Sequence, residues 1–341
     1  MIRVGLIGAG FIGRNHFNQY ERLADRARVV ALCDKEAKRR AGDWSGIGGN
    51  IGDKKGAKRD LGDITPYTDW RAIVDDDRVD LVDICCPTFL HKEIAIAALA
   101  ANKHVLCEKP MALTLTECDA MLEAANESAG KLMIAHCIRF WPEYAWLRQS
   151  VCDQPFGPCR SLQLRRHAEA PSHSLNNWLN NPELSGGALM DLHIHDVDFV
   201  QQLFGKPASI HAQGIGQGGG IDRIHALWHY DDGPIVQLEG CWDMPTGFGF
   251  NMGFTALFEQ AAVVWDLAAN TPLTIYRDGQ EPQQPNIPSA TDGYYHEIDY
   301  FLKSIETDEA PALCLPQESR DAVATALAEK QVIDEHATTC F

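Results

Sequence analysis

The first 135 residues alternate short apolar runs with longer segments in which apolar residues recur at helical spacing. The apolar runs predict buried strands over residues 2–7, 28–33, 79–86, 104–107 and 132–135. Helices are predicted between them, over residues 14–24, 69–75, 92–102 and 115–129, the last with a capping box at its start and Gly130 as its stop. This alternation favours a parallel, doubly wound sheet.

The pattern changes near His136, where strand-like runs that alternate apolar and polar residues dominate. These runs cover residues 160–167, 208–215, 223–230, 235–242, 249–258, 262–267 and 273–277. Alternation with period two is typical of a half-exposed antiparallel sheet. Two closing helices are predicted over residues 295–305 and 317–335. We therefore expect an α/β protein with two domains, residues 1–135 and 136–341, the second built on an open, mainly antiparallel sheet.

Four bulky residues give that second sheet a large apolar face: Trp228, Trp242, Phe254 and Trp265. Such a face predicts a subunit interface, and hence a homodimer or homotetramer. The alternative is that a layer of helices covers it within the same chain.

Composition narrows the class of protein. The 341 residues are 45% hydrophobic and 23% charged, as in soluble globular proteins, and the net charge of −17 excludes a basic nucleic-acid footprint. The 11 cysteines form no Cys-x-x-Cys pair, which indicates a reducing compartment without a disulfide framework. We see no signal peptide and no apolar run long enough for a membrane span, so we expect a cytoplasmic protein.

A glycine-rich turn, Gly8-Ala9-Gly10-Phe11-Ile12-Gly13, lies between the first predicted strand and the first helix. Gly8 would permit the tight turn, Gly10 the approach of a pyrophosphate, and Gly13 close packing of helix on strand. The helix N-terminus offers amides and a positive dipole end to the phosphates. We predict that NAD binds here.

Asp34 ends the second strand, about 20 residues beyond this turn, where a carboxylate binds the ribose hydroxyls of NAD and repels the 2′-phosphate of NADP. Nearby cations leave NADP possible, because any of them can reach such a phosphate: Lys35, Lys38, Arg39, Arg40, Lys54, Lys55, Lys58 and Arg59. Their other interpretation is as solvated charges on a helix and a loop.

Glu108-Lys109-Pro110 directly follows the apolar run 104–107. The carboxyl ends of parallel strands are where open α/β sheets keep their chemistry. Pro87-Thr88 ends the neighbouring strand, so we expect both turns on the edge along which the dinucleotide lies. Taken alone, Glu-Lys-Pro is equally consistent with an ordinary polar turn.

Asp191 and His195 share a face if their segment is helical, because they are four residues apart. A carboxylate beside an imidazole fixes its tautomer and raises its basicity, which suits a general base for a secondary alcohol. In an extended segment His193 and His195 would share a face instead, as zinc ligands do, but no further ligand is evident. A purely structural role for Asp191 and His195 is the third interpretation. We predict no metal.

Together and in this order, the motifs resemble the Gfo/Idh/MocA oxidoreductase family over nearly the whole chain. The resemblance rests on the glycine-rich turn, Pro87-Thr88 with His91, Glu108-Lys109-Pro110, Arg139-Phe140 with Pro142 and Tyr144, and Gly186-Gly187 followed by Asp191 and His195. It implies an N-terminal Rossmann domain and a C-terminal α/β domain whose open sheet often mediates dimers or tetramers.

The resemblance also implies the roles of individual residues. Lys109, Asp191 and His195 would line the substrate pocket beside the nicotinamide, with His195 as the acid/base, oriented by Asp191. The residues assigned to the cofactor are Gly8, Gly10, Phe11, Ile12, Gly13, Asp34, Pro87, Thr88, His91, Glu108 and Lys109. Candidate binders of substrate hydroxyls are Arg139 and Trp178 first, then Asn176, Asn177, His167 and Tyr295.

Two features depart from the family pattern. A third glycine is absent before the Asp/His segment, and the glycine-rich stretch 42–63 is longer than expected. The second departure bears on the choice between NAD and NADP.

The predicted function is reversible oxidation of a secondary alcohol on a sugar, polyol or inositol. His195 would remove the hydroxyl proton while hydride moves to the nicotinamide, and cationic Lys109 would stabilise the developing alkoxide. Two alternatives stay open: a non-catalytic NAD(P)-binding sensor or regulator on the same fold, and a metal-dependent enzyme that uses His193 and His195.

Overall fold

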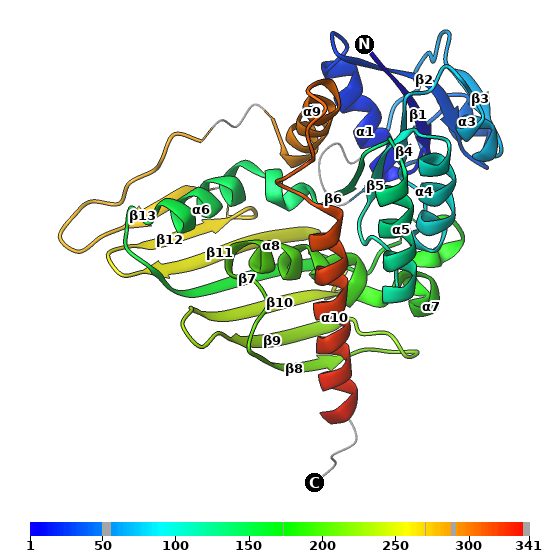
Figure 1. The fold of residues 1–341 in the computed structure, drawn as a ribbon. Helices are drawn as coiled ribbons and strands as arrows, with labels where there is room; N and C mark the ends of the chain where they lie inside the picture. The colour runs from blue at the N-terminus through cyan, green and yellow to red at the C-terminus, as the bar shows by residue number, and fades with distance from the viewer. Residues whose placement is uncertain (50–55, 173, 270, 288–290, 337–341) are drawn as a thin grey trace. The chain divides into compact units, whose positions relative to one another are not determined.

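The computed structural model describes residues 1–49, 56–172, 174–269, 271–287 and 291–336 (Figure 1). The chain forms two compact units. The first unit contains Met1–Cys137 and Asp292–Arg320, with a short segment that ends at Trp178. The second unit contains Ile138–Ser172, Leu179–Thr291 and the chain from Asp321 onward.

The first unit is built on a six-stranded parallel sheet with the order β3-β2-β1-β4-β5-β6, the order of a doubly wound nucleotide-binding fold. Its strands are β1 (Ile2–Ile7), β2 (Ala27–Cys33), β3 (Thr65–Tyr67), β4 (Leu81–Ile84), β5 (His104–Glu108) and β6 (Leu132–Ala135). Every residue of β4 and β6 is buried, as expected for strands covered on both faces. The predicted parallel sheet is confirmed.

Helices of the first unit are α1 (Phe11–Arg22), α2 (Ala37–Arg40), α3 (Arg71–Val74), the short turn η1 (Thr88–Leu90), α4 (His91–Ala100), α5 (Leu115–Glu127) and α9 (Gly293–Glu306). Helix α1 begins three residues before its predicted start, because the last part of the glycine-rich turn is its first turn. Helix α5 carries the predicted cap, in which the Glu117 amide donates to Thr114 Oγ1 at 3.3 Å. It ends at Glu127 rather than 129, and Gly130 serves close packing instead, since a Cβ there would overlap the Lys103 carbonyl.

The second unit is built on a seven-stranded sheet with the order β13-β12-β11-β7-β10-β9-β8. Only β7 and β10 pair in parallel, so the prediction of a mainly antiparallel sheet is confirmed. The strands are β7 (Cys159–Glu169), β8 (Ser209–Ile215), β9 (Arg223–His229), β10 (Ile235–Met244), β11 (Phe250–Phe258), β12 (Ala262–Asp266) and β13 (Thr271–Tyr276).

The remaining helical elements are η2 (Cys137–Phe140), α6 (Pro142–Asp153), η3 (Leu175–Asn180), α7 (Pro182–Ser185), the π-helical turn η4 (Leu189–His193), α8 (Ile194–Phe204) and α10 (Pro316–His336). Helix α6 was not predicted from the sequence. Across the described ranges, no helix has the length and apolar character that a bilayer crossing requires. The ten cysteines in those ranges all have free thiols.

The bulky face of the second sheet is covered within the unit. Trp228, Trp242, Phe254 and Trp265 are all at most 5% exposed. Tyr144 of α6 packs edge-on against Phe254 and Trp265. Helix α6 therefore covers Phe254 and Trp265, and all four residues are buried within the described chain, so the prediction that they form an exposed interface is wrong. The exposed large apolar side chains of this sheet lie on its opposite face: Ile215, Leu227, Ile235, Leu257 and Tyr276.

Candidate functional site

The glycine-rich turn has the geometry that a dinucleotide requires. Gly8 has a φ of +95°, and a Cβ there would overlap the Cys85 carbonyl, while a Cβ on Gly13 would overlap the carbonyl of Gly8. At Gly10 the nearest atom to a built Cβ is Arg39 Nη1 at 3.9 Å, so the backbone there stays open to approach. These positions fit a bound pyrophosphate at the start of α1.

Asp34 lies beside this turn, at the end of β2. Its Oδ2 accepts the Ala9 amide at 2.8 Å and its Oδ1 accepts the Glu36 amide at 2.8 Å. The Arg39 guanidinium lies 3.9 Å from Asp34 Oδ2. Arg40, by contrast, donates to the carbonyls of Asp34 and Lys35. Among the candidate cations that the structure describes, Arg39 is therefore the one closest to Asp34 and the expected adenosine ribose.

The other cations that could reach a 2′-phosphate lie beside different partners or are exposed, as solvated charges would be. Lys58 lies 3.5 Å from Asp43, and Arg59 lies 3.3 Å from Glu21. Lys35 and Lys38 are exposed. Lys54 and Lys55 lie outside the described residues.

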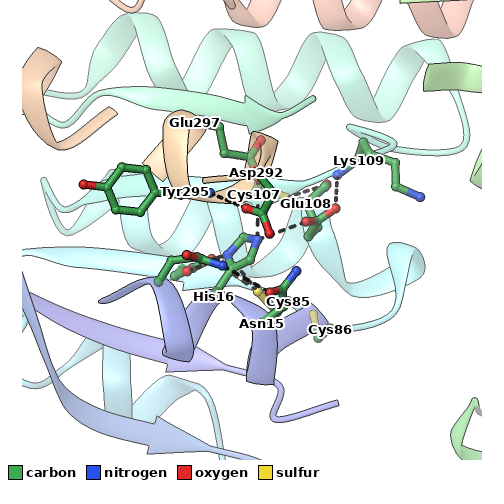
Figure 2. A network of polar contacts seen from close by, with 12 residues as sticks. Asn15, His16, Cys85, Cys86, Cys107, Glu108, Lys109, Asp292, Tyr295 and Glu297 are labelled. Carbon is green, nitrogen blue, oxygen red and sulfur yellow. Dashed lines mark hydrogen bonds and ion pairs between the residues drawn. The ribbon is translucent and has the colours of Figure 1, made fainter. Parts of the chain in front are cut away.

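The Glu108-Lys109-Pro110 turn directly follows β5, as predicted. The Lys109–Pro110 peptide is cis, and the Lys109 amide donates to Glu108 Oε2 at 3.1 Å. Figure 2 shows the Lys109 side chain extending away from the cluster around Glu108. Both the turn and the cluster belong to the first unit.

His91 joins this turn to the turn after β4. Its Nδ1 lies 2.9 Å from the Pro110 carbonyl oxygen and its Nε2 lies 3.0 Å from that of Cys86. His91 and Thr88 are at most 4% exposed. The structure therefore gives His91 a bridging role between two strand ends, and its contact with the cofactor stays a prediction.

Asp191 and His195 lie in the second unit, on one continuous helical segment. Asp191 is in the π-helical turn η4, and His195 is in the first turn of α8. Turns of this kind are frequent at functional sites. Because the segment is helical, the extended arrangement that the zinc alternative requires is wrong. His193 points to a different partner, with its Nε2 3.0 Å from Glu329.

Three buried charged contacts anchor this helical segment to the second unit. Asp196 pairs with Arg166 of β7 at 2.7 and 3.1 Å, and Asp198 pairs with Arg139 through two contacts of 2.7 Å. His193 pairs with Glu329 of α10, whose other oxygen accepts Trp228 Nε1 at 2.8 Å. All these charged side chains are at most 2% exposed. The segment that carries Asp191 and His195 is therefore firmly held.

Comparison with known proteins agrees with this geometry. Residues 2–136 match the oxidoreductase family with an NAD-binding Rossmann fold, and residues 144–263 match the GFO/IDH/MocA C-terminal domain. The chain belongs to the GFO/IDH/MocA oxidoreductase family. Its first unit thus contains the family's NAD-binding domain.

Relatives include several sugar and polyol enzymes. The myo-inositol 2-dehydrogenase of Thermotoga maritima is 24% identical over 98% of this chain and 97% of its own length. The 1,5-anhydro-D-fructose reductase of Ensifer adhaerens is 30% identical over 70% of this chain and 68% of its own. Levoglucosan dehydrogenase, solved with NADH and levoglucosan, shares the fold with a TM-score of 0.82 at 21% identity, covering 98% of this chain and 97% of that one.

The predicted family site is divided between the two units: Lys109 lies in the first, and Asp191 and His195 lie in the second. Their joint approach to a substrate stays a prediction. Arg139, predicted to bind a substrate hydroxyl, is 1% exposed and held by Asp198. This gives it a role in anchoring α8, and its contact with substrate is untested.

The other candidate binders of substrate hydroxyls come from both units, and three of them contact neighbouring side chains. Trp178 packs edge-on against Phe89 in the first unit, with ring centres 6.5 Å apart. The Arg22 guanidinium lies over the Tyr295 ring at 4.7 Å, and His167 Nε2 lies 3.0 Å from Glu239. Asn176 and Asn177 have left-handed backbones, with φ of 53° and 56°, which asparagine tolerates well. Their role as substrate ligands stays a prediction.

Sequence reasoning missed one cluster in this family member. His16 of α1 is completely buried among Asp83, Glu108 and Glu297, which come from three other elements. A histidine three residues after the last glycine of the turn was the only local signal, and its partners lie far away along the chain.

Proposed function

We propose that this protein is an NAD(P)-dependent dehydrogenase or reductase that acts on a secondary alcohol or ketone of a sugar, polyol or inositol. The observation that carries the proposal is the anchored helical segment with Asp191 and His195, in a chain whose other unit has the NAD-binding turn and Lys109 at a strand end. The relatives named above act on substrates of this class.

In the proposed reaction, His195 takes the proton from the substrate hydroxyl and returns it in the reverse direction. Asp191 orients the imidazole, and cationic Lys109 stabilises negative charge on the substrate oxygen. The bound nicotinamide supplies the hydride acceptor. Gly8, Gly10, Gly13 and Asp34 hold the dinucleotide. The rate acceleration that acid/base catalysis does not supply comes from holding the carbinol carbon against the nicotinamide.

The test is nicotinamide absorbance during incubation with a panel that includes myo-inositol, levoglucosan, 1,5-anhydro sugars and common aldoses. Parallel runs with NAD and NADP in both directions cover oxidation and reduction. Turnover on at least one member supports the proposal. Tight NAD binding without turnover in either direction across the panel contradicts it and favours the sensor.

Arg39 is expected to decide whether NADP is accepted. Arg39→Ala should lower kcat/KM with NADP by about tenfold or more, because a hydrogen bond to a charged group contributes about 1.5–3 kcal/mol. The value with NAD should change little, since Asp34 is held by two backbone amides rather than by Arg39 alone. Steady-state kinetics with both cofactors measures this. Lys206→Ala, exposed and in the second unit, is the control, and equal losses with both cofactors would contradict the assignment.

We also propose a homodimer or homotetramer that uses the uncovered face of the second sheet. Leu227, Ile235 and Leu257 on that face are 46–63% exposed. Leu257→Glu is expected to shift the protein toward monomer, because it places a charge within an apolar contact. Light scattering coupled to size exclusion measures the mass. Leu315→Glu, exposed and part of the first unit, is the control, and a monomeric parent protein would remove the proposal.

A further inference from the structure

A buried histidine joins the ends of two strands in the first unit. His16 of α1 is completely buried, with Nδ1 2.9 Å from Asp83 Oδ2 and Nε2 3.2 Å from Glu108 Oε1. Asp83 lies in β4 and Glu108 ends β5. Figure 2 shows His16 and Glu108 facing one another in the same cluster as Glu297. One imidazole ring thus lies between two carboxylates.

The Asp83 side of the ring has enough donors for a full negative charge. Besides His16, Tyr20 donates its hydroxyl to Asp83 at 2.9 Å and Cys85 donates its thiol at 3.3 Å. A buried carboxylate with three donors is stabilised in its ionised form. His16 Nδ1 therefore carries a proton, which it donates to Asp83.

The other side of the ring holds two carboxyl groups. Glu108 Oε1 lies 3.2 Å from His16 Nε2, and Glu297 Oε1 lies 3.8 Å from it. Glu297 is completely buried, and neither of its oxygens has a hydrogen bond within the described structure. Two ionised carboxylates and an unprotonated ring nitrogen repel one another strongly in a buried site. Protons or a bound cation must therefore lie between Glu108, Glu297 and His16 Nε2.

Two protons are enough to remove this repulsion, if one lies on His16 Nε2 and the other on Glu297. Burial lowers the pKa of His16, but the charge of Asp83 and the contact with Cys85 outweigh it, so the pKa lies well above its usual value. Burial and then the charge of Glu108 raise the pKa of Glu297 well above its ordinary range. Both directions agree with the geometry.

We propose that His16 is a positively charged bridge between Asp83 and Glu108, that Glu297 beside it is a neutral acid, and that this bridge positions Lys109. The link to Lys109 is its amide, which donates to the second oxygen of Glu108 at 3.1 Å. His16 and Glu297 are thus positioning residues. The part that concerns Lys109 rests on the proposed function, whereas the charge states of the cluster do not.

The bridge predicts a pH dependence of stability. The groups that face it are Tyr20 from α1, Asp83 in β4 and Cys85 after it, Glu108 from β5, and Asp292, Tyr294 and Glu297 from the N-cap and helix of α9. Because the folded pKa values of His16 and Glu297 exceed the unfolded ones, the folded state binds more protons. Their contribution is present at low pH and declines as pH rises, from about pH 4.3 for Glu297 and about pH 6.5 for His16.

The two glutamates permit a matched test, since each can be replaced by an isosteric neutral amide. Glu297→Gln should keep the melting temperature at pH 7 and make it less dependent on pH, because glutamine resembles the protonated acid. Glu108→Gln should lower the melting temperature and lower kcat/KM by about 10²-fold, the loss typical of a misplaced catalytic group. Glu123→Gln, exposed on α5, is the control. A loss for Glu297→Gln as large as for Glu108→Gln would overturn the proposal.

Nitrogen NMR of the full-length protein measures the protonation of the two ring nitrogens of His16 directly. The His16→Gln variant identifies their signals, because these signals are missing from its spectrum. We expect both ring nitrogens to remain protonated at pH 8, well above the reference pKa of about 6.5 for a histidine side chain. A neutral ring, or one bound divalent metal per chain by elemental analysis, would overturn the proposal. Neither the NMR measurement nor the metal analysis requires the protein to turn over a substrate. An intact bridge without turnover would count against the proposed function alone, and turnover with a neutral ring against the bridge alone.

Discussion

His195→Gln is expected to lower kcat by about 10²–10⁴-fold, the usual contribution of a positioned acid/base. The melting temperature and NAD affinity should stay close to those of the parent protein, because His193, Asp196 and Asp198 anchor the helical segment. The measurement is steady-state kinetics on whichever substrate the panel identifies, together with titration of NADH fluorescence.

His229→Gln, an exposed histidine on β9, is the matched control. If His195→Gln lowered the melting temperature as strongly as the rate, the residue would be structural. If turnover survived at the parent rate, a different group would be the base, and the assignment of Asp191 as its partner would also be wrong.

Arg139→Met should destabilise the second unit by about 3–5 kcal/mol, because it leaves the completely buried Asp198 carboxylate without its ion-pair partner. Replacing both partners removes that penalty, so Arg139→Met with Asp198→Leu should regain most of the free energy of unfolding. Urea denaturation at fixed pH, followed by tryptophan fluorescence, measures both variants.

The double variant also tests the role first predicted for Arg139. Regained stability with an unchanged KM for the substrate shows that the residue only anchors α8. Regained stability with a raised KM shows a substrate contact in addition. A single variant as stable as the parent would contradict the importance of the buried pair.

Most elements were predictable because their signals are local. The strand Leu132–Ala135 has the predicted bounds, and all seven strands of the second sheet lie within two residues of prediction at each end. Strand β3 was missed because it has only three residues and contains Pro66. Helix α6 was missed because its apolar residues follow no clear helical period, although Pro142 at its first turn is a typical start.

The candidate site was predictable only in part, because only some of its features have a local signal in the sequence. The roles of Gly8 and Gly13 follow from a short motif, and their close contacts agree with it. Arg139 pairs with a residue 59 positions away, and His16 with one 67 positions away. A single sequence contains no signal for such long-range pairings. An arginine in a buried ion pair, such as Arg139, therefore looks the same in the sequence as an exposed arginine that binds a ligand.

The return of residues 292–320 to the first unit sets the order in which the nascent protein can be completed. Helix α9 packs on α1, supplies Glu297, and places Asp299 and Glu306 against Arg26. Residue 292 follows residue 137 by 155 positions, so a ribosome adding about 5–20 residues per second leaves this unit unfinished for roughly 8–30 s. During that time one face of α1 lacks its cover. A fragment ending at residue 137 should therefore aggregate rather than serve as a separate NAD-binding module.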